Sequence, residues 1–569
     1  MSNAVTQSTT PFTPRWWHNA VVYQIYPRSF NDSNGDGIGD IPGIIEKLDY
    51  IQALGANVIW LSPVYQSPMD DNGYDISEYR NIAPEFGTMA DMERLIDEAN
   101  SRDIKIVMDL VVNHTSDEHP WFIESKSSLD NPKRDWYIWK DPKPDGSEPN
   151  NWESFFTPKA WQFDQNTGQY YLHLFSNKQP DLNWANPEVR SAIYDMMHFW
   201  LKKGVGGFRM DVINMIGKPQ DFPDATIFDQ GVAGWEHWAN NSLCHQYIRE
   251  MHHQVLRHYD VLTVGETPFT TTLDGRYYSH PARNELSMIF QFDHISIDRE
   301  EHNAIQKPFD LTLYKAIMSK WQDDLYQKGW NSLYWSNHDQ PRAVSRYGDD
   351  GPQYRQISAK MLATVLHLMS GTPYIYQGEE IGMTNKSFRH IDEFNDLMAK
   401  FHYKKLMDRG VSNADAMSFL NAFSRDHARV PVQWKNTKHA GFTTGTPWLP
   451  VNDNYPEINA QQAASDIDSI YHYYRQLIAL RQSENYGEVI VYGAHQLLDP
   501  DDAQVYAYVR HYNGTHLLTV ANFSGQTVTR DYPFKVNCRV ISNYSTPINS
   551  LVAIELAPYQ AFVVDVSPN

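Results

Sequence analysis

Short apolar runs rich in β-branched and aromatic residues recur along the first two thirds of the chain, and longer segments of helical period separate them. This alternation predicts parallel strands joined by helices. Eight such runs occur in this part of the chain: Val21–Tyr26, Val58–Pro63, Ile104–Val112, Gly207–Val212, Leu262–Glu266, Leu286–Phe292, Leu333–Trp335 and Pro373–Tyr376.

Stretches that can form helices follow these runs, and clear examples are Ile44–Ala53, Met89–Ser101 and Ser191–Lys203. Eight strands that are each followed by a helix are typical of a closed (β/α)8 barrel. The pattern therefore predicts an α/β fold with an eight-stranded barrel at its centre.

Two long interruptions and a change of pattern divide the chain further. Roughly 90 residues separate the third run from the fourth, far more than an ordinary βα connection, and predict a small inserted domain over 114–184. A second insertion, about 385–450, follows the eighth run. We expect a flexible leader over 1–14 and barrel segments over 15–113 and 185–487, with a helix near Ser469–Ser483. A C-terminal antiparallel β-sandwich is expected over 488–569, from the runs Val489–Tyr492, Gln504–His511, His516–Asn522, Cys538–Ser542 and Ala561–Val566.

Composition and charge narrow the class of function. The net charge of −21 repels nucleic-acid phosphates and anionic membrane surfaces, so we expect neither as a partner. No apolar stretch approaches the roughly 18 residues of a membrane helix, and the first residues lack the pattern of a signal peptide. The only cysteines, Cys244 and Cys538, give no disulfide framework. We expect a cytoplasmic enzyme, with a monomer favoured, that acts on a small neutral substrate.

Acidic residues close several of the predicted strands. Asp211 ends the fourth run, Glu266 ends the fifth, and Asp339 follows the seventh. Catalytic groups of barrel enzymes lie at these carboxyl ends. A single carboxylate there is more often a helix cap or a salt-bridge partner, but glycoside cleavage needs a pair, one as acid and one as nucleophile or base. Asp211 and Glu266 can supply that pair.

Three basic or imidazole side chains lie at the carboxyl ends of the third, fourth and seventh runs. Arg209 lies two residues before Asp211, on the same strand face, and would keep Asp211 charged, which leaves Glu266 as the acid. His114 and His338 suit hydrogen bonds to sugar hydroxyls. A structural or metal-binding role is the alternative for both histidines, although no Cys or His spacing supports zinc.

Five segments, in this order, resemble glycoside hydrolase family 13, the α-amylase family, and within it the oligo-1,6-glucosidase and dextran glucosidase group. The resemblance covers nearly the whole chain. The segments are Asp109-Leu-Val-Val-Asn-His114, Gln179-Pro-Asp-Leu-Asn183, Gly207-Phe-Arg-Met-Asp-Val212, Val264-Gly-Glu-Thr267 and Asn337-His-Asp-Gln-Pro-Arg342.

The resemblance implies a role for each matching residue. Asp211 would be the nucleophile, Glu266 the general acid/base, and Asp339 the residue that grips and distorts the sugar ring. The glucose pocket would be lined by Tyr74, Asp75, His114, Arg209, His338 and Arg429. The match at Arg429 departs from the family at Val430 and Val432. In the inserted domain, Phe156 would be either a surface on which sugar stacks or a core residue.

Val212, directly after the implied nucleophile, is informative about which glycosidic linkage is cleaved. Similar enzymes with Val at this position tend to cleave α-1,6 bonds, and those with Ala or Thr cleave others. Ordinary strand packing is the alternative explanation. The resemblance therefore implies a retaining exo-acting α-1,6-glucosidase that acts on isomalto-oligosaccharides and short dextrans.

An acidic loop follows the first predicted strand. Asn31 to Asp40 places oxygen side chains at alternate positions between glycines, as at the start of an EF-hand loop, but the twelfth position is Gly43 instead of Glu. In the family a similar loop holds calcium, which implies a structural Ca²⁺, or Mg²⁺, bound by Asp32, Asn34, Asp36, Asp40 and the carbonyl of Ile38. A plain acidic turn is the alternative.

Rival functions use the same fold. A sucrose isomerase would form the same glucosyl-enzyme, but those enzymes resemble one another in an Arg-Leu-Asp-Arg-Asp segment where this chain has Ser296-Ile-Asp-Arg-Glu300. An α-1,4-glucosidase is a second rival. An inactive amylase-like binding subunit is a more distant one, because all three acidic residues are present.

Overall fold

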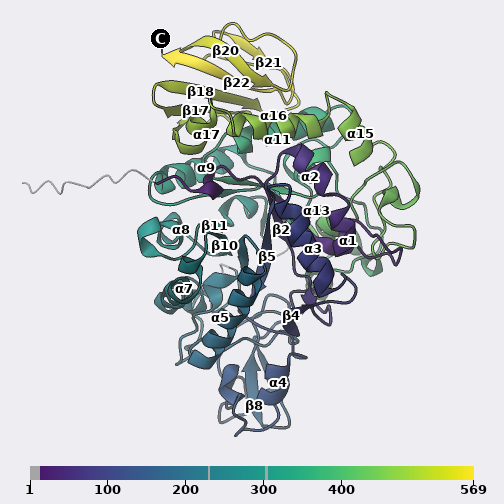
Figure 1. Ribbon diagram of the computed structural model, residues 1–569, viewed down its shortest axis with the longest axis vertical. Helices are drawn as coiled ribbons and strands as arrows, with labels where there is room; N and C mark the ends of the chain where they lie inside the picture. Colours follow the sequence, from purple (N-terminus) through teal and green to yellow (C-terminus); the bar gives the residue numbers. More distant parts are fainter. Residues whose placement is uncertain (1–12, 229–230, 301–304, 569) are drawn as a thin grey trace, which may run out of the picture.

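One eight-stranded parallel sheet forms the centre of the molecule in the computed structural model, which describes residues 13–228, 231–300 and 305–568 (Figure 1). All eight strands lie within or beside the apolar runs of the sequence, and the predicted barrel is confirmed. The strands are β1 (Val22–Ile25), β2 (Val58–Leu61), β5 (Lys105–Val111), β9 (Gly207–Asp211), β10 (Leu262–Glu266), β11 (Met288–Phe290), β14 (Ser332–Leu333) and β15 (Thr372–Tyr376).

The strand order closes the sheet on itself. The order is β11-β10-β9-β5-β2-β1-β15-β14, and a parallel bridge between Ile289 and Asn331 joins its two ends. The register pairs Asp109 of β5 with Arg209 of β9, and Val111 with Asp211. This register sets Asp109 beside Arg209, two residues before the carboxyl ends of both strands.

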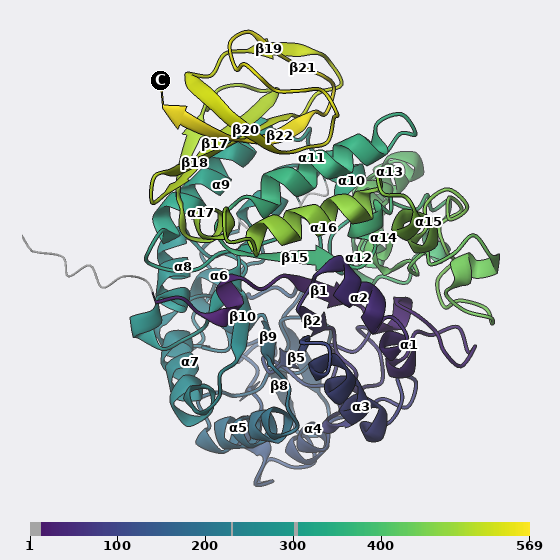
Figure 2. The same cartoon turned by 45° about the horizontal axis from the view of Figure 1, so that its top comes forward.

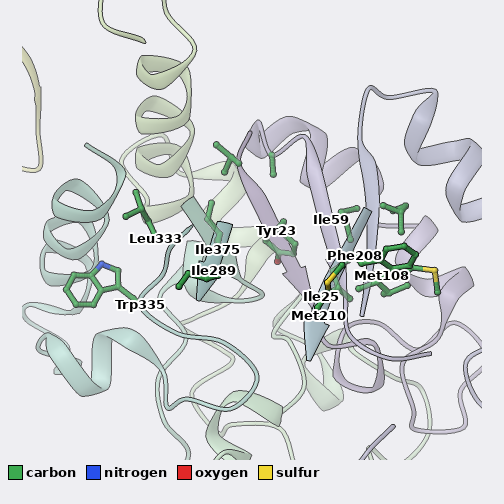
Figure 3. Packing of buried hydrophobic residues seen from close by; sticks show 14 of the residues in the cluster. Tyr23, Ile25, Ile59, Met108, Phe208, Met210, Ile289, Leu333, Trp335 and Ile375 are labelled. Carbon is green, nitrogen blue, oxygen red and sulfur yellow. The ribbon is translucent and has the colours of Figure 1, made fainter. Parts of the chain in front are cut away.

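Strand side chains alternate between two apolar clusters, as the period of two requires. One set points into the barrel, where Trp60, Phe290 and Tyr374 from three different strands meet with ring centroids 4.6–6.3 Å apart. The other set packs outward against the helices and includes Tyr23, Ile59, Met108, Phe208 and Ile375 (Figure 3). Burial on both faces explains why the strands read as continuous apolar runs.

Helices cover the outside of the sheet (Figure 2). α3 (Met89–Asn100) begins with a capping box between Thr88 and Asp91, and α5 (Pro187–Lys202) begins at the cap Asn186. Both match predicted helices. The helix expected over residues 44–53 is instead divided into α1 (Ile41–Ile45) and α2 (Leu48–Leu54). No helix in the described ranges is both long and apolar enough to cross a membrane.

A small sheet interrupts the barrel between β5 and β9 and lies at the bottom of Figure 1. It contains β6 (Trp139–Lys140), β8 (Gln169–Leu172) and β7 (Trp161–Asp164) in that order, antiparallel throughout. Its apolar face joins the barrel, since Trp152 and Leu172 share a cluster with Val212 and Met215. The inserted segment therefore packs directly on the turn that follows β9.

The segment after β15 is helical and returns to the mouth of the barrel. It contains α12 (Leu397–Asp408), α13 (Asn413–Phe423) and the short α14 (Asp426–Arg429). A separate apolar cluster, built around Phe388, Phe394 and Phe419, holds these helices together. The segment brings Arg425 and Arg429 to the catalytic end of the barrel.

The C-terminal region is a β domain, as expected, with one correction. Val489–Tyr492 was expected to be a strand, but residues Gly487–Tyr492 form helix α17, and the sheet begins with β16 (Ala494–Leu498). Val489, Ile490 and Val491 are all buried, and a short run buried on every side does not distinguish strand from helix. Five strands form the main sheet in the order β16-β17-β18-β22-β20, and β19 (Val528–Arg530) pairs with β21 (Ile554–Leu556).

Three of the strands expected in this domain are confirmed with small shifts, and the fourth is longer than expected. They are β17 (Val505–Tyr512), β18 (Thr515–Asn522), β22 (Ala561–Pro568) and the longer β20 (Phe534–Ser542). Helices α11 (Arg355–His367) and α16 (Ile470–Arg481) lie between the barrel and this sheet (Figure 2). The C-terminal domain thus stands on the side of the barrel, away from the inserted sheet.

Candidate active site

Neighbouring strands deliver the acidic groups to one rim of the barrel. Asp211 is the last residue of β9 and Glu266 the last of β10, and these two strands are hydrogen-bonded neighbours. Asp339 follows β14 in the loop before α10 (Ala343–Tyr347). Because all strands are parallel, their carboxyl ends meet at the same end of the barrel.

Arg209 ties the site together. Its guanidinium lies 2.9 Å from Asp109, 2.7 Å from Asp211 and 2.6 Å from Glu266, and the residue is 1% exposed. One buried cation therefore serves three carboxyl groups. The expected contact between Arg209 and Asp211 is present, and Arg209 contacts Glu266 as closely.

The two carboxyl groups at the ends of β9 and β10 titrate differently. Burial raises the pKa of Asp211 to about 6, although Arg209 opposes the shift. Burial also raises the pKa of Glu266, to about 8, and the negative charges of Asp211 and Asp339 add to that shift. Near pH 7 Glu266 therefore carries a proton and Asp211 is ionised, which is the division of roles that an acid and a nucleophile require.

The same two groups hydrogen-bond each other. An inverting glycosidase separates its carboxyl groups by roughly 6.5–9.5 Å so that a water molecule fits between them and the sugar. Direct contact leaves no such space. The arrangement is suited to the retaining reaction, in which one carboxylate attacks the anomeric carbon and the other donates and later removes a proton.

Asp339 is held as an anion by its neighbours. It lies 2.8 Å from Arg429, 3.4 Å from Arg425 and 3.5 Å from His338. Burial alone would raise the pKa of Asp339, but His338 and the two guanidinium groups bring it well below its usual range. The side chain therefore presents a fixed negative charge beside the carboxyl pair.

Val212 adopts a conformation that is rare for a β-branched residue. Its φ is +34° and its ψ +40°, in the left-handed region. This turn directs the Val212 N–H to Glu266, whose Oε2 accepts it at 3.2 Å. The side chain is buried beside Met215 at the interface with the inserted sheet. Backbone strain at this position thus contributes to holding the acid.

Aromatic and imidazole rings build the rest of the pocket. Tyr74 donates its hydroxyl to Asp109 at 2.9 Å, and its ring stacks on His338 with centroids 5.2 Å apart. His114 lies 3.1 Å from the Tyr74 carbonyl through Nε2. Burial lowers the pKa of His114 to about 4 and that of His338 to about 3, so both rings are neutral at physiological pH.

Phe156 reaches this end of the barrel from the inserted segment. Its ring packs edge-on against Phe175 at 5.6 Å and lies under the Arg425 guanidinium at 5.3 Å. Through Arg425 the ring is linked to Asp339. Phe156 therefore packs in the core of the inserted segment and also lies beside the active site. Its contact with sugar stays a prediction.

The structure places Asp75 apart from the carboxyl cluster. Both of its carboxylate oxygens accept backbone N–H groups of its own loop, from Asp70 at 2.8 Å and Asp71 at 3.1 Å. The carboxyl group that this loop sends toward the pocket is that of Asp71, which faces Arg425 at 3.6 Å and accepts from Gln179 at 3.2 Å. The pocket position expected for Asp75 is therefore corrected to Asp71.

Sequence reasoning missed Arg425 as well. The side chain contacts Asp71, Asp339 and Asp396, the last at 2.7 Å, and is almost fully buried. One signal could have found it, because Arg425 precedes Arg429 by four residues, the spacing that places two side chains on one face of a helix. The sequence pattern predicted no helix in this segment, so the spacing of four residues could not be used to place Arg425.

The acidic loop after β1 curls around its own oxygen atoms. Asp32, Asn34 and Asp36 each accept the N–H of the residue two positions on, at 2.8–3.0 Å. Asp40 instead accepts from Gly43 and Ser33 and caps α1. Within the described ranges no three His, Cys, Asp or Glu side chains gather as a metal site. The donor types fit a hard cation, and binding one would have to draw these carboxylates together.

A barrel whose strand ends carry an acid, a nucleophile and a third fixed carboxylate defines a glycoside hydrolase. The description "Alpha amylase, catalytic domain" matches residues 24–493, and "Maltogenic Amylase, C-terminal domain" matches 495–563. The chain belongs to the α-amylase family.

Characterised relatives and solved structures agree over almost the full length. The chain is 53% identical to an oligo-1,6-glucosidase of Parageobacillus thermoglucosidasius, covering 96% of this chain and 98% of that protein. It is 48% identical to a glucan 1,6-alpha-glucosidase of Streptococcus pneumoniae, with 97% and 99% covered.

Two crystal structures are similar as a whole. Trehalose-6-phosphate hydrolase of Bacillus licheniformis gives a TM-score of 0.92 at 48% identity, covering 97% of this chain and 100% of that one. An isomaltulose synthase of Klebsiella gives 0.94 at 44% identity, with the same coverage. The scaffold is thus shared by enzymes with different sugar substrates, and linkage has to be argued from the site.

Proposed function

We propose that this chain is a retaining α-glucosidase that releases glucose from the non-reducing ends of isomalto-oligosaccharides and short dextrans. The contact between Asp211 and Glu266, with pKa values raised to about 6 and about 8, carries the proposal. The α-1,6 linkage draws support from Val212 and from the names of the two relatives that act on such bonds.

The residues divide the reaction as follows. Glu266 gives its proton to the glycosidic oxygen as Asp211 attacks the anomeric carbon, so that the glycosidic bond breaks and a glucosyl ester forms. Glu266, now ionised, removes a proton from water, which attacks the ester and frees glucose with its α configuration retained. Asp339 and the pocket rings of Tyr74, His114 and His338 hold the terminal sugar.

Product analysis tests the proposal. The purified protein is incubated separately with isomaltose, isomaltotriose, maltose, sucrose and trehalose 6-phosphate, and the products are followed by NMR. We expect α-glucose from the two isomalto-sugars and none from the Asp211→Asn variant. Isomaltulose from sucrose would identify an isomerase, and preferred cleavage of maltose or of the phosphorylated disaccharide would overturn the linkage while leaving the catalytic pair in place.

We further propose that the loop over residues 31–40 takes a structural Ca²⁺. Its carboxylate, amide and carbonyl oxygens are the ligands this ion prefers, and Asp32, Asn34, Asp36, Ile38 and Asp40 would hold it. The loop lies against the segment that follows β15, since Asp32 N–H donates to Phe442 and Gly37 accepts from Trp448, both at 3.0 Å. The ion would stabilise this junction and would not take part in bond cleavage.

A cytoplasmic location and a monomeric state complete the proposal. Both cysteines are free, with Cys244 buried and Cys538 exposed. An exposed thiol is compatible with a reducing compartment. Cell fractionation and sedimentation of the purified protein would test location and oligomeric state separately.

A further inference from the structure

A buried ion pair lies behind His114, outside the groups assigned to the reaction. Lys218, in the loop after β9, meets Asp181, in the segment between β8 and α5, at 2.6 Å. Their side chains are 1% and 0% exposed. A buried ammonium group is tolerated only where all its neighbours accept hydrogen bonds, so the identity of those neighbours is informative.

The second neighbour of this ammonium group is an amide. Lys218 Nζ donates to Oδ1 of Asn113, the residue that precedes His114. Because an ammonium group can only donate, the amide atom that faces it must be the oxygen. The NH2 group of Asn113 is thereby turned the other way, and its Nδ2 lies 3.2 Å from Nδ1 of His114.

This chain of contacts determines where His114 carries its proton. An NH2 group can only donate, so Nδ1 of the ring accepts and bears no hydrogen. The ring proton of the neutral imidazole is then on Nε2, which faces the Tyr74 carbonyl at 3.1 Å. The order of donors runs from Lys218 through Asn113 to His114 and ends at Tyr74.

We propose that Lys218 is a positioning residue that acts through Asn113 to hold His114 as a neutral ring with its only N–H on Nε2. The proposal rests on the proposed function, in which His114 contacts the terminal glucose. A ring held in this form has one donor in one direction, and that donor binds the Tyr74 carbonyl, so the ring is fixed relative to the Tyr74 backbone. It adds no positive charge beside the acid and nucleophile, whose roles depend on the charges around them.

The charged groups around His114 fit this role. Asp181 and the Tyr74 carbonyl favour the protonated ring, whereas burial, the largest effect, and Lys218 oppose it. Asp71 is connected on the other side through Gln179, whose NH2 group lies 3.4 Å from Nε2 of the ring but donates to Asp71 at 3.2 Å and to the Tyr74 carbonyl at 3.3 Å, so the ring Nε2 can still carry its hydrogen. Lys218 therefore offsets the charge of Asp181 as well as fixing the amide of Asn113.

The second pocket histidine has a parallel arrangement. Nε2 of Gln24, on β1, lies 2.8 Å from Nδ1 of His338. An amide NH2 group thus faces Nδ1 in both rings, and both keep Nε2 for other partners. The repetition from unrelated parts of the barrel supports a functional need for this one form of the ring.

The variant Asn113→Asp tests the proposal with little change of shape. One carboxylate oxygen still accepts from Lys218, but the other now faces Nδ1 of His114 with an acceptor in place of a donor. We expect the ring to take a proton on Nδ1, its pKa to rise, and kcat/KM on isomaltose at pH 7 to fall about tenfold, the effect of one misplaced hydrogen bond. The acid side of the pH profile gains an ionisation that the wild type lacks.

Ring ¹⁵N shifts of selectively labelled histidine, assigned with a His114→Gln variant, report the tautomer directly. Asn413→Asp is the matched control, because the exposed Asn413 accepts from the Tyr403 hydroxyl through Oδ1 and an aspartate accepts equally well. If Asn113→Asp does not fold, the double variant Lys218→Met/Asp181→Asn removes both charges together and should give a mixture of ring tautomers.

A wild-type His114 protonated on Nδ1, or an Asn113→Asp protein with unchanged ring shifts and pH profile, would overturn the proposal. The ring shifts need no substrate. If the wild type releases no glucose from any sugar, the proposed function fails, while the same spectra still decide whether Lys218 sets the tautomer.

Discussion

At the scale of single residues, the site depends on how the same burial acts on different carboxyl groups. Glu266 and Asp211 both lose solvent, but Glu266 also faces the negative charges of Asp211 and Asp339, and its pKa reaches about 8 where that of Asp211 reaches about 6. Asp339 is more exposed, with 29% of its side chain accessible, and two arginines keep it ionised. Neighbouring charges therefore decide the role of each carboxyl group.

The pH dependence of kcat/KM follows from these values. Asp211 must be ionised, so activity falls as the pH drops through about 6, and Glu266 must be protonated, so activity falls as the pH rises through about 8. We expect a bell-shaped profile for isomaltose. In Glu266→Gln the alkaline limb should disappear and kcat should fall by roughly 10²–10⁴. A retained alkaline limb in that variant would assign it to another group.

Two carboxyl groups of one loop give a matched pair of variants. Asp71→Asn weakens the contact with Arg425 at the pocket, so we expect a higher KM for isomaltose and a melting temperature near that of the wild type. Asp75→Asn replaces one of two acceptors of backbone N–H groups with a donor, so we expect a lower melting temperature. Steady-state kinetics and thermal unfolding of both proteins measure the difference. The reverse pattern would return the pocket role to Asp75.

At the scale of elements, the strands were predictable and part of the site was not. Strands buried on both faces give continuous apolar runs, and the polar residues that close them identify the rim of the barrel. Asp71 and Arg425 lie in irregular segments whose path depends on tertiary packing, so neither spacing nor apolar pattern placed them. The strand predicted for Val489–Tyr492 was wrong for the opposite reason. The apolar run predicted burial correctly, but it did not distinguish a helix from a strand.

The turn after β9 makes a prediction about linkage. Val212 is buried at the contact between barrel and inserted sheet, with its backbone in the left-handed region. Val212→Thr keeps the β-branched shape and adds a hydroxyl beside the space expected for the leaving sugar. We expect the ratio of kcat/KM for isomaltose to that for maltose to fall by about tenfold or more, the scale of one hydrogen-bonding group. An unchanged ratio would leave Val212 with a packing role only.

At the scale of the whole molecule, the first and last loops of the barrel are joined to each other. The loop after β1 packs on residues 442–448, and a Cβ added at Gly37, whose φ is +95°, would lie 1.9 Å from the Thr446 carbonyl oxygen. Only glycine fits this junction without displacing the neighbouring backbone. This junction thereby fixes the segment after β15, which carries Arg425 and Arg429, to the loop after the first strand of the barrel.

Removal of divalent cations tests the role of that junction. If a calcium ion stabilises it, chelation should lower the melting temperature by roughly 2–5 °C, with recovery on adding Ca²⁺. Activity on isomaltose at 25 °C should change little, since the proposed ligands are not among the groups that contact the carboxyl pair. Asp36→Asn should lower the melting temperature in the same way and abolish the effect of chelation. If neither chelation nor Asp36→Asn changes the melting temperature, the loop is a plain acidic turn that binds no structural ion.

The formation of a glucosyl ester on Asp211 is the central claim, and mass spectrometry of a trapped intermediate tests it most directly. Glu266→Gln is incubated with α-glucosyl fluoride, whose fluoride leaves without a proton, and the missing base slows hydrolysis of the ester. We predict a glucosyl adduct on the peptide that contains Asp211. The double variant Glu266→Gln/Asp211→Asn should give no adduct. An adduct on another residue, or release of β-glucose with no adduct, would contradict the account.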